Sequence, residues 1–368
     1  DLTMKDKVAS LDKEHNLYYV NPIEIQKYQY KGEMIKIKHK SIDLLVTPNH
    51  NLYLKEHHKD KWEFFKADNI GYRWVNTLNS INWKGKEKKY FEIAKTQDKT
   101  CPSKSYDNFL MDNWLEFLGW YIAEGWSQKR SNTHKNYNIC ISQTREKYVK
   151  EIENCLLSLN FNHNYKENRF LINSKQLWLY LKPLGKSYEK YIPKEFLNLS
   201  KRQLKILFDS LIKGDGRIDE RNRTFYYTSS KKLADQIQEI GLKIGFNSTI
   251  TSRIRDTHGK INGRKIKSKR PLYRIYFRKR KLGQIDTYKH IKKEFYNDIV
   301  YCCTVPSHIL IVRRNGKPLI CGNSGSYVYS ANLLGIKFLG FELEEKYSID
   351  IQKRFSQKII TINQKEMF

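Results

Sequence analysis

The strongest constraint on the fold is an internal repeat that fills the middle of the chain, from about 107 to 297. Each copy opens with an apolar helical pattern, at 114–125 and at 204–216, and continues through a strand, an amphipathic helix and further strands. The later segments are expected at 137–142, 145–159 and 169–172, and at 224–228, 231–245, 248–255 and 273–278. A helix–strand–strand–helix order that recurs twice predicts an α+β domain with pseudo-twofold symmetry.

The opening helix of each copy ends in an acid beside a glycine, as Glu124-Gly125 and as Asp215-Gly216. Small residues recur on both helices, so their backbones can approach closely, and side-by-side packing would bring the two acids together. Paired carboxylates suit Mg²⁺ and two-metal hydrolysis of a phosphodiester. The negative end of a helix also favours a bound cation over an unneutralised acid. The alternative is that each acid is an ordinary surface residue at a helix end.

Segments 117–125 and 208–216 resemble the two dodecapeptide motifs of LAGLIDADG homing endonucleases, with the acid at the family's position in both. The resemblance implies that Glu124 and Asp215 coordinate the catalytic metal, Mg²⁺, and that paired sheets form a saddle over the DNA major groove. The family also uses a lysine near the metal, for which Lys190 is the candidate. The expected protein is a monomer with internal pseudo-twofold symmetry that cuts both strands of a specific DNA site.

The charge of the chain favours a polyanionic partner, here double-stranded DNA. Lys and Arg number 68 against 39 acids, a formal net charge of +29. Segment 253–281 holds thirteen of these cations and one acid, with aromatic residues between them, and is expected to form a β-ribbon in the major groove. The alternative is a solvated basic loop on a lysine-rich protein. The DNA-contact candidates are Arg253, Arg255, Arg264, Lys265, Lys267, Arg274 and Arg278.

Both flanks of the repeat are rich in strand patterns. Segments 17–20, 34–37 and 44–47 read as strands, and 311–317 reads as a hairpin that turns at Asn315-Gly316. Residues 1–100 and 298–323 are therefore expected to form one β domain that the repeat interrupts.

Three segments of these flanks resemble an intein. Thr47-Pro48-Asn49-His50 resembles the motif that polarises the upstream scissile bond, and 301–308 resembles the strand motif before an intein's end, with His308 assisting. Asn323 stands directly before Ser324. An asparagine amide there can attack its own carbonyl, and the next hydroxyl is the nucleophile that receives the upstream chain. The resemblance implies a Hint splicing domain with autocatalytic cleavage.

Three features depart from the intein pattern. The upstream Cys or Ser nucleophile is not in the chain, which begins at Asp1 and is expected to start inside a longer product. Gly322 stands where histidine is commonest, and Cys302 where many inteins carry aspartate. The six cysteines include no CxxC pair, which predicts reduced thiols in a cytoplasmic protein. The chain as a whole is expected to be microbial or phage-encoded. No apolar run is long enough to cross a membrane.

Residues 324–368 switch to an α/β pattern that resembles the end of an amino-methyltransferase acting on DNA adenine or cytosine. The resemblance implies that Gly325 approaches S-adenosylmethionine and that Glu342 binds its ribose hydroxyls, a cofactor required only by the intact host enzyme. A generic α/β segment is the alternative.

The sequence thus predicts a multidomain chain: an all-β Hint domain at 1–100 and 298–323, an α+β LAGLIDADG pseudo-dimer at 101–297, and a methyltransferase fragment at 324–368. Two other interpretations remain open. The repeat could be a sequence-specific DNA-binding remnant without cleavage, or the chain could act mainly as its host, a methyltransferase that uses S-adenosylmethionine.

Overall fold

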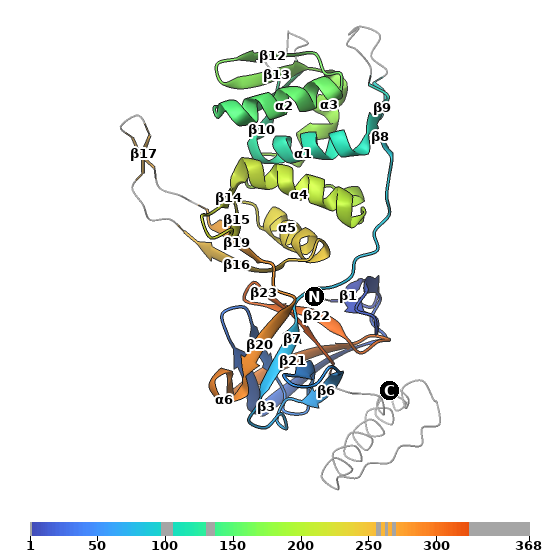
Figure 1. The fold of residues 1–368 in the computed structure, drawn as a ribbon, viewed down its shortest axis with the longest axis vertical. Helices are drawn as coiled ribbons and strands as arrows, with labels where there is room; N and C mark the ends of the chain where they lie inside the picture. Colours follow the sequence, from blue (N-terminus) through green and yellow to red (C-terminus); the bar gives the residue numbers. More distant parts are fainter. Residues whose placement is uncertain are drawn as a thin grey trace, which may run out of the picture.

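The computed structural model describes residues 2–96, 106–129, 137–254 and 270–323, together with the backbone of two short strands at 259–261 and 264–266. Within these residues the chain forms two bodies stacked along the long axis of the molecule (Figure 1). One is an α/β body that holds the repeat, and the other is a β body. None of the helices in the described ranges combines the length and the apolar character needed to cross a membrane.

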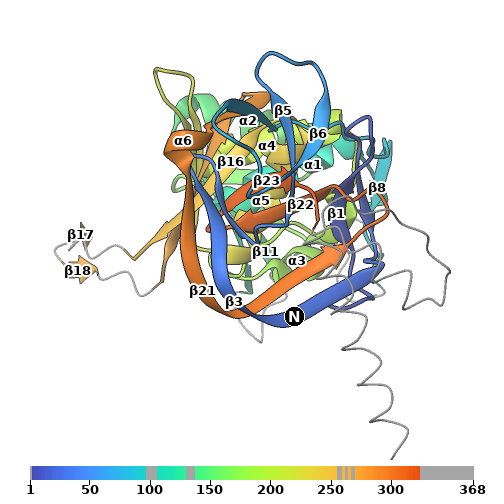
Figure 2. The same cartoon turned by 90° about the horizontal axis from the view of Figure 1, so that it is seen from below.

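The β body contains three sheets, and each combines strands that precede the α/β body with strands that follow it. The sheet orders are β2-β1-β22-β23, β20-β7-β5-β6 and β21-β3-β4. Strands β3 (Glu24–Lys38) and β21 (Ile291–Thr304) pair antiparallel along their length, and Figure 2 shows them curving side by side. The other elements are β1 (Val8–Leu11), β2 (Leu17–Val20), β4 (Asp43–Val46), β5 (Asn51–Glu56), β6 (Trp62–Lys66), β7 (Trp74–Leu78), β20 (Leu282–Asp286), α6 (Thr287–His290), β22 (Leu310–Arg314) and β23 (Lys317–Cys321).

The β body resumes earlier than the sequence suggested. The boundary expected between 297 and 298 falls inside β21, and β20 already pairs with β7. The expected hairpin at Asn315-Gly316 is confirmed, because β22 and β23 pair around it and both turn residues have positive φ, at 48° and 73°.

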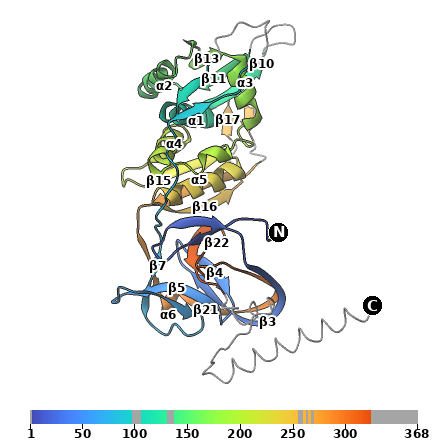
Figure 3. The same ribbon diagram turned by 90° about the vertical axis from the view of Figure 1, so that its right-hand side faces the viewer.

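The tip of the β22–β23 hairpin docks on the α/β body (Figure 3). The backbone N–H of Ile250 donates to the carbonyl of Gly316 over 2.9 Å, and Nε2 of Gln238 donates to the same oxygen over 3.0 Å. Nη1 of Arg313 donates to Asp235 over 2.6 Å. These bonds connect the hairpin that leads to Asn323 with the second half of the repeat.

The α/β body consists of two halves with the same order of elements. The first half has α1 (Met111–Glu124), β10 (Gly125–Lys129), β11 (Tyr137–Ser142), α2 (Glu146–Ser158), β12 (His163–Lys166), β13 (Arg169–Asn173) and α3 (Lys175–Leu181). The second has α4 (Lys201–Asp215), β14 (Gly216–Ile218), β15 (Thr224–Thr228), α5 (Lys231–Lys243), β16 (Asn247–Arg253) and β19 (Leu272–Arg278), with β17 (Gly259–Ile261) and β18 (Arg264–Ile266) as a separate hairpin. Strands β8 (Tyr90–Glu92) and β9 (Asn108–Leu110) precede the first half.

The two halves have equivalent sheets, β10-β11-β13-β12 and β14-β15-β19-β16. This common order confirms the predicted internal repeat. Strands β10 and β14, which begin at the glycine after each acid, were not predicted.

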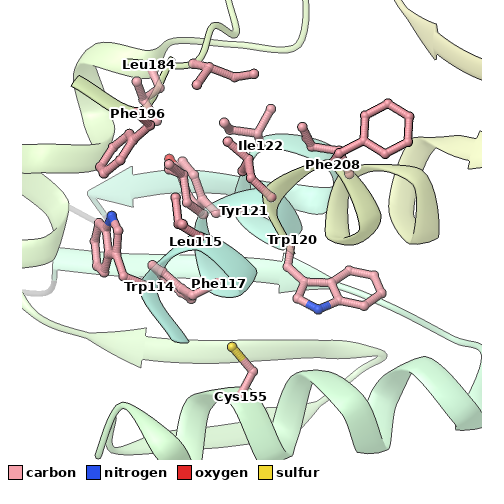
Figure 4. Close-up of a cluster of buried hydrophobic side chains, with 14 of the residues drawn as sticks. Trp114, Leu115, Phe117, Trp120, Tyr121, Ile122, Cys155, Leu184, Phe196 and Phe208 are labelled. Carbon is pink, nitrogen blue, oxygen red and sulfur yellow. The ribbon is translucent and has the colours of Figure 1, made fainter. Parts of the chain in front are cut away.

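Helix α1 is apolar nearly all round, as expected for a helix buried on every side. Trp114, Phe117 and Trp120 on it are each fully buried, and Figure 4 shows them packed between neighbouring elements. The core they belong to is continuous with side chains of the second half such as Phe208. The starts of α4 and α5 are fixed by Ser200 and Ser230, whose side chains accept hydrogen bonds from backbone N–H groups in the first turn.

Candidate functional site

Helices α1 and α4 pack so closely that small residues are required between them. A Cβ added to Gly119 would lie 2.6 Å from Cβ of Ser210, and one added to Gly214 would lie 2.4 Å from Cβ of Ala123. Oγ of Ser210 also donates to the carbonyl of Glu116 over 2.7 Å. The close approach predicted from the spacing of small residues is therefore confirmed.

This packing brings the two predicted acids together where the helices end. Cγ of Glu124 lies 3.5 Å from the Cβ position of Gly214, the residue before Asp215. Burial raises the pKa of Asp215 to about 7, the charge of Glu124 contributes to the rise, and Lys190 opposes it. Burial also raises the pKa of Glu124, against the opposing charge of Arg145. The two carboxylates thus repel one another in a place that is poorly hydrated.

Lys190 lies beside this pair. Its side chain is 3% exposed, and Nζ donates to the carbonyl of Tyr121 over 3.1 Å in the last turn of α1. Burial lowers the pKa of Lys190 to about 7, although Asp215 opposes the shift. Ser230 holds the segment in place by donating to the carbonyl of Lys190 over 2.7 Å. An amine with a pKa near neutrality can give or take a proton at physiological pH.

Tyr226 is a site residue that the sequence analysis missed. It lies on β15 opposite Gly216 and is fully buried, and its hydroxyl has no hydrogen-bond partner among the described residues. Burial and the charges of Asp215 and Glu124 all raise its pKa, so the phenol keeps its proton. In the sequence, Tyr226 is one of several aromatic residues in a predicted strand. Nothing in that pattern distinguishes it from an ordinary core residue.

The donor set fits a magnesium ion better than a closed metal cage. The described ranges contain no group of three or more His, Cys, Asp and Glu side chains arranged to hold a metal. Mg²⁺ is commonly bound by one or two carboxylates together with water and substrate phosphates. Glu124 and Asp215 offer such a pair, and a cation would relieve the repulsion that raises their pKa values.

Three of the predicted DNA-contact residues have described side chains. Arg253 on β16 and Arg274 on β19 are exposed on neighbouring antiparallel strands. Arg278 is half-buried, donates to Oγ1 of Thr249 over 2.9 Å and lies over the ring of Tyr276. The side chains of Arg255, Arg264, Lys265 and Lys267 lie outside the described residues.

The β body has a second cluster of polar residues, at the end of the described chain. Asn323 is buried, and its Nδ2 is hydrogen-bonded to Nδ1 of His308 over 3.0 Å. The backbone N–H of Asn51 donates to the carbonyl of Asn323 over 3.1 Å. This contact of Asn51 was not predicted, and the N–H polarises the Asn323 carbonyl.

The predicted residues Thr47 and His50 adjoin this cluster. Thr47 is buried and His50 is half-buried, and the backbone N–H of His50 donates to the carbonyl of Thr47 over 3.0 Å. Burial lowers the pKa of His50 to about 4, while a hydrogen bond with the backbone of Gly322 opposes the shift. A cavity of about 890 Å³ is lined by these residues and by Cys302, Cys303 and Cys321. Ser324, Gly325 and Glu342 lie outside the described residues.

Comparisons with known proteins match the repeat and also longer parts of the chain. The chain is 31% identical to an ATP-dependent Clp protease proteolytic subunit of Chlamydomonas moewusii over 268 residues, which cover 68% of this chain and 26% of that protein. It is 28% identical to the C-terminal section of a DNA-directed RNA polymerase subunit beta of Stigeoclonium helveticum, over 87% of this chain and 34% of that protein. It is 29% identical to a ribonucleoside-diphosphate reductase subunit beta of Aquifex aeolicus over 119 residues, 31% of this chain and 16% of that protein. The chain thus spans at most about a third of the length of these relatives.

Two solved structures resemble the chain at 11% identity. One is the N-terminal LAGLIDADG domain of DUF199/WhiA, with a TM-score of 0.29, over 47% of this chain and 77% of that one. The other is the homing endonuclease I-WcaI bound to its DNA recognition sequence, with a TM-score of 0.32, over 50% of this chain and 84% of that one. The LAGLIDADG-like domain family matches the chain twice, over 115–197 and over 203–279, and each match begins in one of the paired helices. Residues 115–197 and 203–279 therefore form a LAGLIDADG-like domain.

Proposed function

We propose that the LAGLIDADG-like domain is a site-specific endonuclease that cuts both strands of a DNA duplex with Mg²⁺. The observation that carries the proposal is the meeting of Glu124 and Asp215 at the ends of two closely packed helices, with Lys190 beside them. Because both halves of the repeat belong to one chain, a single molecule supplies both acids.

Each residue of this site has a defined task in phosphodiester hydrolysis. Glu124 and Asp215 would hold the metal. When bound, Mg²⁺ stabilises the charge that develops on the phosphate and lowers the pKa of a coordinated water. Lys190, with a pKa of about 7, can move a proton at Nζ or stabilise negative charge there. Arg253 and Arg274 would hold the duplex on the sheet face.

A cleavage assay tests this function. The full chain would be incubated with Mg²⁺ and a duplex carrying the host coding sequence without the insertion. We expect a double-strand cut near the insertion point, which Asp215→Asn and Glu124→Gln abolish while leaving DNA affinity within a few-fold. Glu153→Gln, at an exposed acid on α2, is the control and should cut normally. Cutting by Asp215→Asn at the wild-type rate would overturn the proposal, and binding without cutting by the wild type would indicate the DNA-binding remnant.

We further propose that the β body is a Hint splicing domain and that the chain is an intein. The supporting observation is the environment of Asn323: His308 contacts its amide nitrogen, and Asn51 donates to its carbonyl oxygen. Attack of Nδ2 on that carbonyl carbon would form a succinimide and break the bond to Ser324, whose nitrogen leaves as the amine after gaining a proton. The three curated relatives agree with an inserted element, because their names describe unrelated activities and each matches over a minor part of its length.

Release of the segment after Asn323 tests the splicing proposal. Asn323→Ala should stop the release of residues 324–368, whereas Glu124→Gln should leave it unchanged. Equal release by Asn323→Ala and the wild type would show that the cleavage does not use the asparagine amide.

The host assignment rests on sequence resemblance. We propose that residues 324–368 belong to a DNA adenine or cytosine amino-methyltransferase, with Gly325 and Glu342 at its S-adenosylmethionine site. In the ligated host protein, Glu342→Gln should weaken S-adenosylmethionine binding, which calorimetry can measure. Unchanged affinity would contradict the role given to Glu342.

A further inference from the structure

A cleft of about 1240 Å³ lies where the two bodies meet. Its upper wall comes from α4, the β14–β15 turn and β19, and its lower wall from β7, β20, α6 and the turn at 39–41. The cleft is separate from the paired acids and from Asn323, none of which lines it.

Four of the six lysine and arginine side chains that line the cleft form no ion pair within the described residues, whereas Arg223 is paired with Asp219 and Lys205 with Asp209. Lys40, Lys279 and Arg280 are exposed, and Arg278 is half-buried. No ion pair within the described part of the chain joins any of these four residues to an acid. The acid in the lining, Asp209, is paired with Lys205.

The positive charge in the cleft contributes to lowered pKa values of groups in its lining. Burial lowers the pKa of His39, and His290, Lys40, Lys317 and Arg278 lower it further. The His39 and His290 rings lie 4.6 Å apart, at the boundary between β3 and α6. Burial also lowers the pKa of Arg278, and Arg280 adds to the shift against the opposing effect of Tyr276. The whole group of cations thus favours an anion.

Strand β19 connects the cleft with the sheet that carries the proposed DNA contacts. Arg274 lies in the middle of β19, and Arg278 at its end lines the cleft. Arg274 and Arg278 are four positions apart, so their Cα atoms are about 14 Å apart along the strand. This distance is roughly the length of four base steps along DNA. Helix α6 and the β17–β18 hairpin also lie on the same side of the molecule, opposite β1, in both Figure 1 and Figure 2.

We propose that this cleft binds the sugar–phosphate backbone of the DNA duplex beyond the segment held by the two sheets, so that the β body takes part in DNA binding. The inference rests on the proposed endonuclease function and extends it to a surface that the LAGLIDADG-like domain shares with the β body. Trp74, 47% exposed, and Tyr276 supply apolar contacts for the sugar rings between the cationic side chains. Phosphate contacts of this kind position the protein on the duplex and do not depend on the DNA sequence.

The experiment compares a cleft variant with a charge-matched control in the full chain. The cleft variant carries Lys40→Gln, Lys279→Gln and Arg280→Gln. The control carries Lys5→Gln, Lys7→Gln and Lys13→Gln, three exposed lysines near β1 on the opposite side. Binding is measured from 50 to 300 mM salt on a short duplex centred on the cut site and on duplexes extended at either end.

We expect the wild type and the control to bind one extended duplex more tightly than the short one, on the order of ten-fold at physiological salt, and the cleft variant to lose that gain. The slope of log affinity against log salt on that duplex should fall by up to about 3 in the cleft variant alone. Cleavage of the short duplex should be equal in all three proteins, which shows that they are folded.

Equal affinity of the wild type for short and extended duplexes would overturn the cleft proposal while leaving the endonuclease intact. An equal loss in the control and cleft variants would also overturn it, because the effect would then be one of net charge. Absence of any specific DNA binding by the wild type would instead refute the proposed function itself.

Discussion

At the residue scale, the candidate nuclease site depends on ionisable groups that burial holds away from their usual charge states. The pKa of Asp215 is raised to about 7, and that of Lys190 is lowered to about 7, with burial as the main cause of both. The two groups face each other, and each moderates the shift of the other. The site therefore stores unfavourable free energy that a bound cation and a phosphate would release.

The first prediction concerns the pH dependence of stability. The pKa of Asp215 is higher in the folded chain than in the unfolded chain, so the folded state binds the extra proton between about pH 4 and pH 7, and stability falls as pH rises through that window. Asparagine cannot ionise, so Asp215→Asn should be more stable than the wild type at pH 8 without metal, on the order of 4 kcal/mol, because the pKa of Asp215 in the folded chain lies roughly three units above that of an unfolded aspartate. Urea unfolding at pH 8 and pH 4 checks this, because the difference should vanish at pH 4. A constant difference at both pH values would show that charge is not the cause.

The second prediction concerns His308. Its contact with Nδ2 of Asn323 fits a group that moves protons during attack on the carbonyl. His308→Ala should therefore slow release of residues 324–368 by about 10²- to 10⁴-fold, as measured by gel densitometry over time. His163→Ala in the α/β body is the control. A rate within two-fold of the wild type would exclude the role.

At the element scale, the function of the repeat depends on how closely α1 and α4 approach. The short residues at their contact set the separation of the helix axes and, with it, the separation of the two acids. Cores of this density respond to one additional methyl group.

The third prediction follows from this packing. Gly214→Ala would place a methyl carbon 2.4 Å from Cβ of Ala123, so the helices must move apart. We expect a loss of about 1 to 3 kcal/mol in the free energy of unfolding and a drop in cleavage greater than the drop in DNA affinity. Glu153→Ala on the exposed face of α2 should change neither quantity. An unchanged cleavage rate in Gly214→Ala would show that the site tolerates a wider helix separation.

Sequence patterns predicted these helices well and the surrounding elements less well. The acid–glycine pairs marked the ends of α1 and α4, and the apolar spacing marked their contact. Strands β10 and β14 were missed because each begins at the residue directly after the end of a helix, without a turn between them. Asn51 and Tyr226 were missed because their importance depends on contacts across the fold, such as the bond from Asn51 to Asn323.

At the scale of the whole molecule, the two proposed chemistries occupy separate bodies. The acid pair lies at the end of α1 and α4, whereas Asn323 and His308 lie among the strands of the β body. The two clusters have no residue in common. A substitution that abolishes one activity should therefore leave the other activity intact.

The fourth prediction is this independence. Glu124→Gln should abolish DNA cleavage and leave release of residues 324–368 at the wild-type rate, and Asn323→Ala should do the reverse. Both activities are measured on the same purified proteins. Loss of both in a single variant that remains folded by circular dichroism would mean that the two sites are functionally coupled.

The docked hairpin sets a condition on any shortened version of this chain. Deleting the α/β body would remove both donors to the Gly316 carbonyl, and Asp235 would no longer partner Arg313. It would also uncover Tyr19 and Trp83, whose rings now pack against the buried Lys243. A compact splicing tool built from the β body would thus need a polar cap at the hairpin tip and polar replacements for the two aromatic residues. Without these changes, the β body would expose unpaired backbone groups and two aromatic rings, and it would tend to aggregate.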